Sequence, residues 1–495
     1  MFPRFINGAV RARLALAIVF LIAMPALRAQ TSNQNSASTT PSSSGVDTTA
    51  EMSENPPVSG LDEPSFEPRF GTRSYLLPGV EVSEAVDSNE SSVPGGNSIG
   101  NETYAVGSVD LQKLWKTHPF DLDYLGGVGW YTGPYGGAYQ LQSLAATQRF
   151  LWRTGQLALR DSFGYLPEGT FGFDSFGGAG AFLAAGNSPI NNGGGVLNGS
   201  GIPGGGGGAL LGFGQFGSIG NSPRISNLGV ADITQYLSPR SALVITGAYG
   251  ITNFTGSNSF GYLNSQEVVS QVGYNHLLSR KDQIGLMYAY EAYRYPSSGA
   301  GSLNVNVFQV MYAHRISGKL NFVMGGGPEL IQTHQILNVL GVLFVPVNSR
   351  SINESGQISF NYRASSRTSL SLGYLRYVNP GSGFFAGANT DAVNLGMTHV
   401  LGRRWNLNGE SGYSRNSKLQ AVTASVASNA QTYHYWFAGV ALRRQLSRQF
   451  GAYASYQYNA FGSGTGFCVS FSCNSYGRQI GLIGVDWTPH PIRLD

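Results

Sequence analysis

Two short glycine motifs are the first candidates for chemistry in this sequence. Residues 96–100 (GNSIG) have the form of a nucleophile elbow, in which a serine attacks a carbonyl carbon. That serine must stand between a strand and a helix, whereas Ser98 lies in a Gly- and Ser-rich stretch that leads into a strand pattern. Residues 212–217 (GFGQFG) match the dinucleotide-binding fingerprint without the strand and helix that it requires. We expect neither motif to act in catalysis.

Two cysteines are the next candidates. Cys468 and Cys473 are the only cysteines of the sequence, and in an exported chain a pair this close predicts a small disulfide loop, with two free thiols as the alternative. The sequence has no HExxH motif, no phosphate-binding loop and no cluster of Cys and His ligands. We therefore expect no metal, no cofactor and no enzyme activity. A hydrolase built from Ser, His and acidic groups at one end of the fold stays open as an alternative.

The composition narrows the function further. Charged residues make up 12% of the 495 residues and the net charge is +4, whereas a typical soluble protein has about 25% charged residues. Nucleic-acid binding needs clustered Lys and Arg for phosphate contacts, so we expect no nucleic acid as a partner. Aromatic residues also reach 12%, which argues against a chain that is disordered throughout.

The N-terminus predicts export. Arg4, Arg11 and Arg13 precede an apolar run from Leu14 to Met24, and small residues follow up to Ala29. This order is typical of a secretory signal peptide over residues 1–29, cleaved near Ala29. The run is too short for a membrane-spanning helix, which needs about 20 apolar residues. Residues 30–73 are rich in Ser, Thr, Asn and Pro and predict a disordered leader in the periplasm.

A strand pattern with a period of two residues follows over residues 74–495, and the hairpin of residues 268–290 shows it best. Val272 and Tyr274 fall on one face of its first limb. Gln271 and Asn275 fall on the other face, which Glu291 continues after the second limb. Each limb has about 11 residues, close to the roughly 9–11 that a tilted strand needs to cross a bilayer.

Short polar turns recur along the chain and alternate with longer loops. Six turns share a pattern built on Ser or Gly with Arg or Lys, at residues 237–241, 278–282, 316–320, 365–369, 401–405 and 446–450. The longer stretches between them include residues 336–351 and 379–390, which we interpret as loops. Residues 167–222 form a long Gly-rich loop whose scattered Phe residues favour inward packing. With one strand on each side of every connection, the pattern predicts about 18 strands, and 16 to 18 is the range we expect.

One face of these strands carries almost all the charge. We expect its side chains to line a pore: Asp110, Asp121, Asp123, Arg149, Arg160, Asp232, Glu291, Arg315, Arg363, Glu410 and Arg443. The apolar face carries amphipathic residues three positions before the short turns, where lipid headgroups lie at the periplasmic interface: His276, His314, His399 and Arg444. A metal or pH-sensing site made by the histidines is the alternative, but successive hairpins are spaced around a barrel wall.

A soluble β-sandwich or propeller also has alternating strands, so alternation alone does not identify a membrane protein. The signal peptide, the strand length and the rhythm of short turns and long loops together favour a transmembrane antiparallel up-and-down β-barrel, with short periplasmic turns and long extracellular loops. The sequence resembles Gram-negative outer-membrane β-barrels of the porin-like kind, without a motif that identifies a subfamily. The last strand, residues 478–487 (RQIGLIGVDW), is similar to the C-terminal signal of such proteins and is followed by Thr488–Asp495.

The resemblance implies passive diffusion of small solutes across the outer membrane. It also implies contact with outer-membrane lipid and lipopolysaccharide, recognition of the last strand by the barrel-assembly machinery, and the option of a homo-oligomer. The first alternative is a surface-exposed binding or structural barrel without an open pore. The second is a hydrolase embedded in the barrel.

Overall fold

The computed structural model describes residues 56–61, 74–89, 99–132, 137–166, 224–255, 263–296, 301–339, 343–381, 385–419, 432–463 and 476–494. The predicted signal peptide, the Gly-rich residues 167–222 and the pair Cys468 and Cys473 lie outside these ranges. So does the predicted leader, apart from residues 56–61. No helix within the described ranges is long and apolar enough to cross a membrane.

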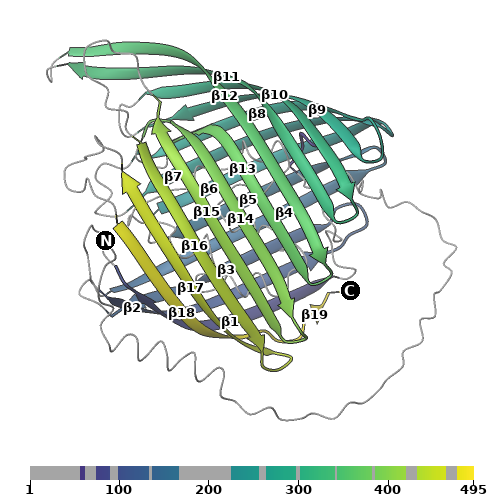
Figure 1. Cartoon of the computed structure of the whole chain (residues 1–495), viewed down its shortest axis with the longest axis vertical. Coiled ribbons are helices and arrows are strands. Elements are labelled where there is room, and N and C mark those ends of the chain that lie inside the picture. Colours follow the sequence, from purple (N-terminus) through teal and green to yellow (C-terminus); the bar gives the residue numbers. More distant parts are fainter. Residues whose placement is uncertain are drawn as a thin grey trace. The chain divides into compact units, whose positions relative to one another are not determined.

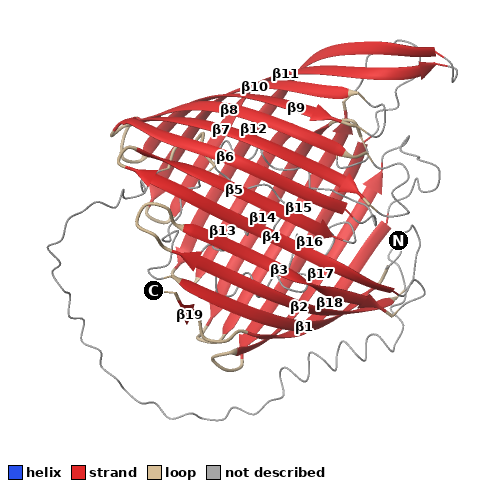
Figure 2. Ribbon diagram, turned by 180° about the vertical axis from the view of Figure 1, so that it is seen from behind, coloured by secondary structure: helices blue, strands red, loops and turns tan. Residues whose placement is uncertain are grey.

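Every long element of the described chain is a β-strand, as Figure 2 shows. The strands are β1 (Tyr75–Asp87), β2 (Gly100–Lys113), β3 (Phe120–Tyr131), β4 (Gly137–Trp152), β5 (Gly155–Leu166), β6 (Arg224–Ser238), β7 (Ser241–Phe254), β8 (Ser265–Leu277), β9 (Asp282–Arg294), β10 (Ser302–Ser317), β11 (Leu320–Val339), β12 (Leu343–Ser365), β13 (Thr368–Asn379), β14 (Ala388–Leu401), β15 (Trp405–Lys418), β16 (Thr432–Gln445), β17 (Phe450–Ser463), β18 (Tyr476–Trp487) and the two-residue β19 (Ile492–Arg493).

The long strands form one closed antiparallel barrel of 18 strands, which confirms the predicted fold. Each strand pairs with its neighbours in the sequence, and β1 closes the wall by pairing with β18. The closing register runs from Val80 opposite Trp487 to Asp87 opposite Ile480. Past the last wall strand, Ile492 and Arg493 pair with the start of β1. Closure leaves no unpaired strand edge, which is a requirement for a sheet in lipid. Figure 1 shows the strands inclined to one another around the wall.

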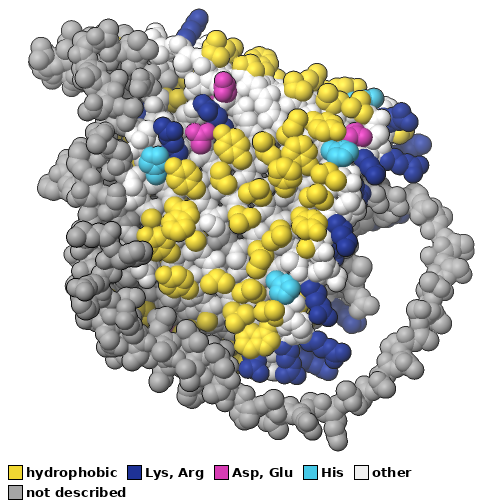
Figure 3. Space-filling model, viewed as in Figure 1, with side chains coloured by type: hydrophobic (Ala, Val, Ile, Leu, Met, Phe, Trp, Pro, Cys, Tyr) yellow, Lys and Arg dark blue, Asp and Glu magenta, His cyan; other side chains and the backbone are white. Residues whose placement is uncertain are grey.

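The two faces of the wall differ as the alternation predicts. Outward side chains are large and apolar, for example Leu286, Val310 and Val485, each more than half exposed at 55%, 55% and 53%. Their inward neighbours in the sequence are buried, as for Met287 and Gln309. Figure 3 shows apolar side chains spread over the outer surface and Lys and Arg gathered along one rim. A wall that exposes apolar side chains and buries polar ones is typical of a barrel in lipid.

The six predicted short turns are present at one end of the barrel, which we call the short-turn end. The opposite end, the long-loop end, corrects two predictions. Residues 336–351, interpreted as a loop, are largely the paired ends of β11 and β12, where Ile336 stands opposite Pro346 and Val339 opposite Leu343. The alternating apolar and β-branched residues of this stretch suit a strand. Residues 379–390, also interpreted as an outer loop, continue into β14 from Ala388, and the described residues Pro380, Gly381, Phe385 and Gly387 are buried.

Residues 56–61 depart from the predicted leader. They form a turn in which Gly60 donates its N–H to the carbonyl of Pro57 at 2.9 Å, and all six residues are buried. The segment contacts the inward face of β8 and β9. A disordered spacer is therefore the wrong description for these six residues, because their polar groups find partners on the wall. For the rest of residues 30–73 it stays a prediction.

Candidate functional site: the barrel interior

The inward face of the wall is polar and charged. The structure places all the predicted pore-lining residues on strand positions that alternate with outward ones, and only for Glu410 is the side chain not described. Asp121, Arg149, Asp232 and Glu291 are buried at 4%, 7%, 1% and 1% exposure. The wall brings together residues that are far apart in the sequence. The structure therefore also shows which of these charges lie together. Whether these groups line an open path stays a prediction.

An acidic patch lies on β2 and β3 at the short-turn end. Asp110 and Asp123 stand directly opposite each other, and Gln112 stands opposite Asp121. Gln112 donates to Asp121 at 3.0 Å, and the Tyr75 hydroxyl donates to Asp110 at 3.2 Å. Like charges directly opposite each other destabilise a sheet. Three carboxylates this close together make the patch a local source of negative potential inside the barrel, which Arg149 near Asp121 partly offsets.

Basic and acidic side chains meet where the barrel closes. Arg443 on β16 makes two hydrogen bonds to Asp486 on β18, from Nε at 3.2 Å and from Nη2 at 2.5 Å. Arg478 on β18 forms an ion pair with Asp87 on β1, and both side chains are 3% exposed. The Tyr453 hydroxyl hydrogen-bonds to Glu81 on β1. The sequence predicted inward positions for Arg443 but could not show these partners, which come from strands far apart in the chain.

A second group of carboxylates lies nearer the long-loop end. Glu267 on β8 and Glu291 on β9 are buried, and Glu291 accepts a hydrogen bond from the Tyr293 hydroxyl at 2.8 Å. Glu329 on β11 is buried on the same inward face. Charge of one sign on neighbouring strands favours cations over anions inside a pore. The composition of the strands gave no sign that these three acids lie near one another.

The connection between β13 and β14 folds into the long-loop end. Pro380, Gly381, Phe385 and Gly387 are buried. The hydroxyl of Tyr295, the residue that follows β9, donates to the carbonyl of Pro380 at 3.1 Å. Gly387 has a φ of +93°, a left-handed conformation that favours glycine. A buried hydrogen bond therefore ties the loop to the chain at the end of β9.

The same loop packs on aromatic side chains of β16 and β17. Phe385 is 2% exposed and its ring lies 5.5 Å from that of Tyr433 on β16. Tyr433 in turn lies 5.8 Å from Phe461 on β17. The loop thus contacts Tyr295 at the end of β9 as well as Tyr433 on β16, at the long-loop end of the barrel. Its described residues add buried apolar and aromatic contacts to the interior at this end.

Four amphipathic residues occupy outward strand positions at the short-turn end: His276, His314, His399 and Arg444. His276 and His399 hydrogen-bond to the hydroxyls of Ser241 and Thr368 on the neighbouring strands, at 2.9 and 2.8 Å. His314 pairs with Asp282 at 2.7 Å, and the Arg444 guanidinium lies over the Trp405 ring at 5.1 Å. Each residue has its own partner, and within the described chain no group of three potential metal ligands occurs. Their contact with lipid headgroups stays a prediction.

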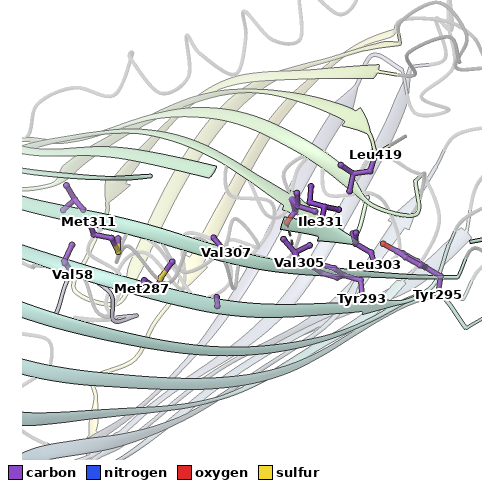
Figure 4. Packing of buried hydrophobic residues seen from close by; sticks show 13 residues of the cluster. Val58, Met287, Tyr293, Tyr295, Leu303, Val305, Val307, Met311, Ile331 and Leu419 are labelled. Atoms are coloured by element: carbon purple, nitrogen blue, oxygen red, sulfur yellow. Dashed lines mark hydrogen bonds between the residues drawn. The ribbon is translucent and has the colours of Figure 1, made fainter. Parts of the chain in front are cut away.

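Segment 56–61 is the part of the interior that sequence reasoning missed. Its Val58 joins a buried apolar cluster with Met287 and Met311, and Figure 4 shows these three side chains together at one end of the cluster. Tyr293, Tyr295, Leu303 and Leu419 lie at the other end. A hexapeptide of Pro, Val, Ser, Gly and Leu within a polar leader has no periodic pattern that would predict structure. Only its contacts with the wall distinguish it from the rest of the leader.

The sequence matches no known protein-family model and no curated protein. Its fold is similar to solved outer-membrane β-barrels. OccK2 (OpdF) of Pseudomonas aeruginosa is 8% identical with a TM-score of 0.38, over 83% of this chain and 98% of that chain. The ferric-catecholate import receptor Fiu of E. coli K12 is 10% identical with a TM-score of 0.39, over 85% and 82%. The ferric citrate transporter FecA is 12% identical with a TM-score of 0.40, over 82% and 63%. Because one fold hosts many functions, the function has to be argued from this chain's own residues.

Proposed function

We propose that this chain is a porin-like channel of the outer membrane through which small hydrophilic solutes diffuse. The observation that carries the proposal is the division of one closed wall of 18 strands into an apolar outer face and a charged inner face. A barrel of this strand number has room for an aqueous lumen. Buried charges that face inward have polar partners on the wall, as Asp121 has Gln112 and Asp87 has Arg478, whereas unpartnered charges in a filled apolar core would destabilise the fold.

The charges favour weak selectivity for cations. Two groups of carboxylates face the interior, one at Asp110, Asp121 and Asp123 and one at Glu267, Glu291 and Glu329. Near the closing seam, Arg443 and Arg478 are each paired with an aspartate, so these arginines offset acids within their own pairs. The two acidic groups therefore make parts of the passage negative, while the inward Arg149, Arg160, Arg315 and Arg363 keep the preference for cations weak.

The proposed orientation puts the short turns in the periplasm and the long loops outside the cell, as is usual for such barrels. The outer face then contacts lipid and lipopolysaccharide, and the row of His276, His314, His399 and Arg444 lies at the periplasmic interface. The last strand, β18, presents Ile483, Val485 and Trp487 outward and is the segment that we expect the barrel-assembly machinery to recognise. Export requires the predicted signal peptide.

Conductance across a planar lipid bilayer tests the proposal. The purified chain should insert and give discrete current steps in a salt solution. Folding is checked separately by the shift in gel mobility that heating produces in barrel proteins. A folded barrel that gives no current steps would overturn the channel, and current steps that vanish when the protein is pre-boiled would support it.

A binding or structural barrel without an open pore is the second candidate. The observation that favours it is the presence of chain inside the wall, at segment 56–61 and at the loop with Phe385. If this chain seals the interior, the folded protein does not conduct, and removing the side chain of Phe385 does not restore conductance. The bilayer measurement thus separates the two candidates.

A further inference from the structure

Ser59 is held on the inward wall by two carboxamide side chains of β8. Its N–H donates to Asn275 Oδ1 at 3.0 Å, and Asn275 Nδ2 donates to the Ser59 hydroxyl at 2.6 Å. The Ser59 carbonyl accepts from Gln271 Nε2 at 2.7 Å. Both carboxamides are 1% exposed. Every polar group of Ser59 therefore has a partner on the wall, as a buried polar residue requires.

Gln283 on β9 engages the start of the same segment. In the amide orientation that satisfies both of its groups, it donates to the Pro56 carbonyl at 3.1 Å and accepts from the Val58 N–H at 3.2 Å. A carboxamide carries one acceptor and a donor group, so it can complement a peptide group as a neighbouring strand does. Together with Asn275 and Gln271, Gln283 contacts the main chain at Pro56, Val58 and Ser59.

Two glycines make the space for the segment. A Cβ atom added at Gly273 would stand 2.0 Å from Ser59 Oγ and 2.5 Å from Ser59 Cβ. One added at Gly285 would stand 2.8 Å from Val58 Cγ1. These distances are far shorter than any van der Waals contact, so a side chain at either position would displace the segment. The hollow thus fits the segment closely.

Apolar contacts complete the fit. Val58 is 5% exposed within the cluster that includes Met287 and Met311. Leu61 is 1% exposed and packs with Leu228, Val230 and Val269. Burying two aliphatic side chains adds a favourable, non-directional contribution to the directional hydrogen bonds. Hydrogen bonds to the main chain give affinity and side-chain pockets give specificity, which is the division seen in peptide-binding domains.

We propose that the inward face of β8 and β9 is a peptide-binding site, and that its ligand is the chain's own segment 56–61. The site consists of Gln271, Gly273, Asn275, Gln283 and Gly285. Its ligand is a short turn-forming peptide with a small polar residue, Ser59, between two aliphatic ones. A bound segment takes up room inside the barrel, so its release widens the passage; this consequence rests on the proposed channel.

Thiol labelling tests the site without reference to transport. The full chain carries Ser59→Cys in a background of Cys468→Ser and Cys473→Ser, and a water-soluble maleimide reports on the introduced thiol. Gly273→Val fills the hollow. The matched control is Gly247→Val on neighbouring β7, where an added Cβ meets nothing within 4 Å. In barrels shown to be folded, the thiol should react about tenfold faster with Gly273→Val than with Gly247→Val, because a displaced segment is exposed to the reagent. A tenfold change corresponds to about 1.4 kcal/mol in the free energy of segment binding. Equal rates in the two variants would overturn the site.

A second pair of substitutions covers the case in which Gly273→Val does not fold. Gln271→Ala with Asn275→Ala removes three hydrogen bonds to Ser59 and adds no volume. Labelling of the thiol should again become faster than in the Gly247→Val control. An unchanged rate in this folded variant would likewise overturn the proposal.

A synthetic peptide tests the site from outside the chain. In the full chain with Ser59→Trp, the chain's own segment is too large for the hollow and leaves the site free. A fluorescent peptide of residues 55–62 (NPPVSGLD) should then bind to the site in a saturable manner. It should not bind when Gly273→Val is added. Equal binding to both chains, or to neither, would contradict the site. Conductance of the Gly273→Val and Gly247→Val barrels then tests the consequence for transport: a channel that fails to conduct in both variants rejects the proposed function and leaves the labelling result intact.

Discussion

Asp87 on the first strand and Arg478 on the last long strand form a buried ion pair across the seam where the barrel closes. Asp87 also accepts the N–H of Asn89 at 2.9 Å, which holds the carboxylate in place. The two residues are 391 positions apart in the sequence. Closure therefore brings together two opposite charges that no local sequence pattern connects. They meet at the one strand pairing that cannot form until the whole wall is complete.

Removing one partner of this pair should destabilise the barrel more than removing both. Asp87→Asn leaves a buried guanidinium without its counter-charge and is expected to cost about 3–5 kcal/mol of unfolding free energy. The double variant Asp87→Asn with Arg478→Gln should lose less, because no unpaired charge stays buried. Urea titration of the barrel in lipid vesicles measures both. Equal losses in the single and double variants would show that the pair is not coupled.

The outer face should reject charge. Val310 on β10 is 55% exposed on that face and lies near the middle of its strand. Val310→Arg is expected to destabilise the folded barrel in lipid vesicles by about 2–4 kcal/mol, since an arginine near the bilayer midplane is costly. Val310→Leu is the control and should leave the urea midpoint almost unchanged. If Val310→Arg lowers the urea midpoint no more than Val310→Leu does, the outer face contacts water and not lipid.

The inward loop should limit the passage. Phe385→Ala removes the ring that packs on Tyr433 and is expected to raise the single-channel conductance. It should also lower the free energy of unfolding, by at most about 3–5 kcal/mol. The loss is smaller if the loop collapses into the space that the ring leaves. Phe308→Ala removes an aromatic ring from the outer face, where Phe308 is 45% exposed, and should leave conductance unchanged. If both variants conduct alike, the loop does not form the narrow part of the path.

The acidic patch should set ion preference. Asp110→Asn with Asp123→Asn removes two charges that face each other across β2 and β3. We expect the reversal potential in a salt gradient to move toward anions, because a pore selects ions by the charges that line it. Asp161→Asn is the matched control, since Asp161 is exposed on the outer face and contacts Asn227 at 3.1 Å. A shift of the same size in the control would remove the patch as its cause.

The strands and short turns could be predicted from the sequence because both depend on nearest neighbours. Side chains alternate between two faces with a period of two residues, so Gln271 and Val272 reveal their faces within one limb of the hairpin. The repeated turns fixed the rhythm of the hairpins, and with it the strand count. The row of His276, His314 and His399 was found in the same way, by counting back from each turn.

The interior arrangement could not be predicted in this way. The register that sets Asp110 against Asp123 belongs to the hairpin of β2 and β3, and the pairing that brings Asp87 within reach of Arg478 depends on strand stagger around the closed wall. Phe385 lies in a stretch that reads as an external loop, because a Gly- and Pro-rich sequence has the same composition whether it folds in or out. Segment 56–61 lies in a stretch whose composition predicts disorder, and its order depends on contacts with strands more than 200 residues away.

By itself, the sequence determined that the wall is a β-barrel with an apolar and a polar face, since alternation and turn spacing are local properties. Only the tertiary structure decided what lies inside the wall: which charges pair, which loop enters the mouth and which segment fills the hollow at Gly273 and Gly285. The physical reason is that these contacts join residues whose separation in the sequence carries no periodic signal. They form when the wall brings their strands and loops together, and the pair of Asp87 and Arg478 forms only when the last long strand meets the first.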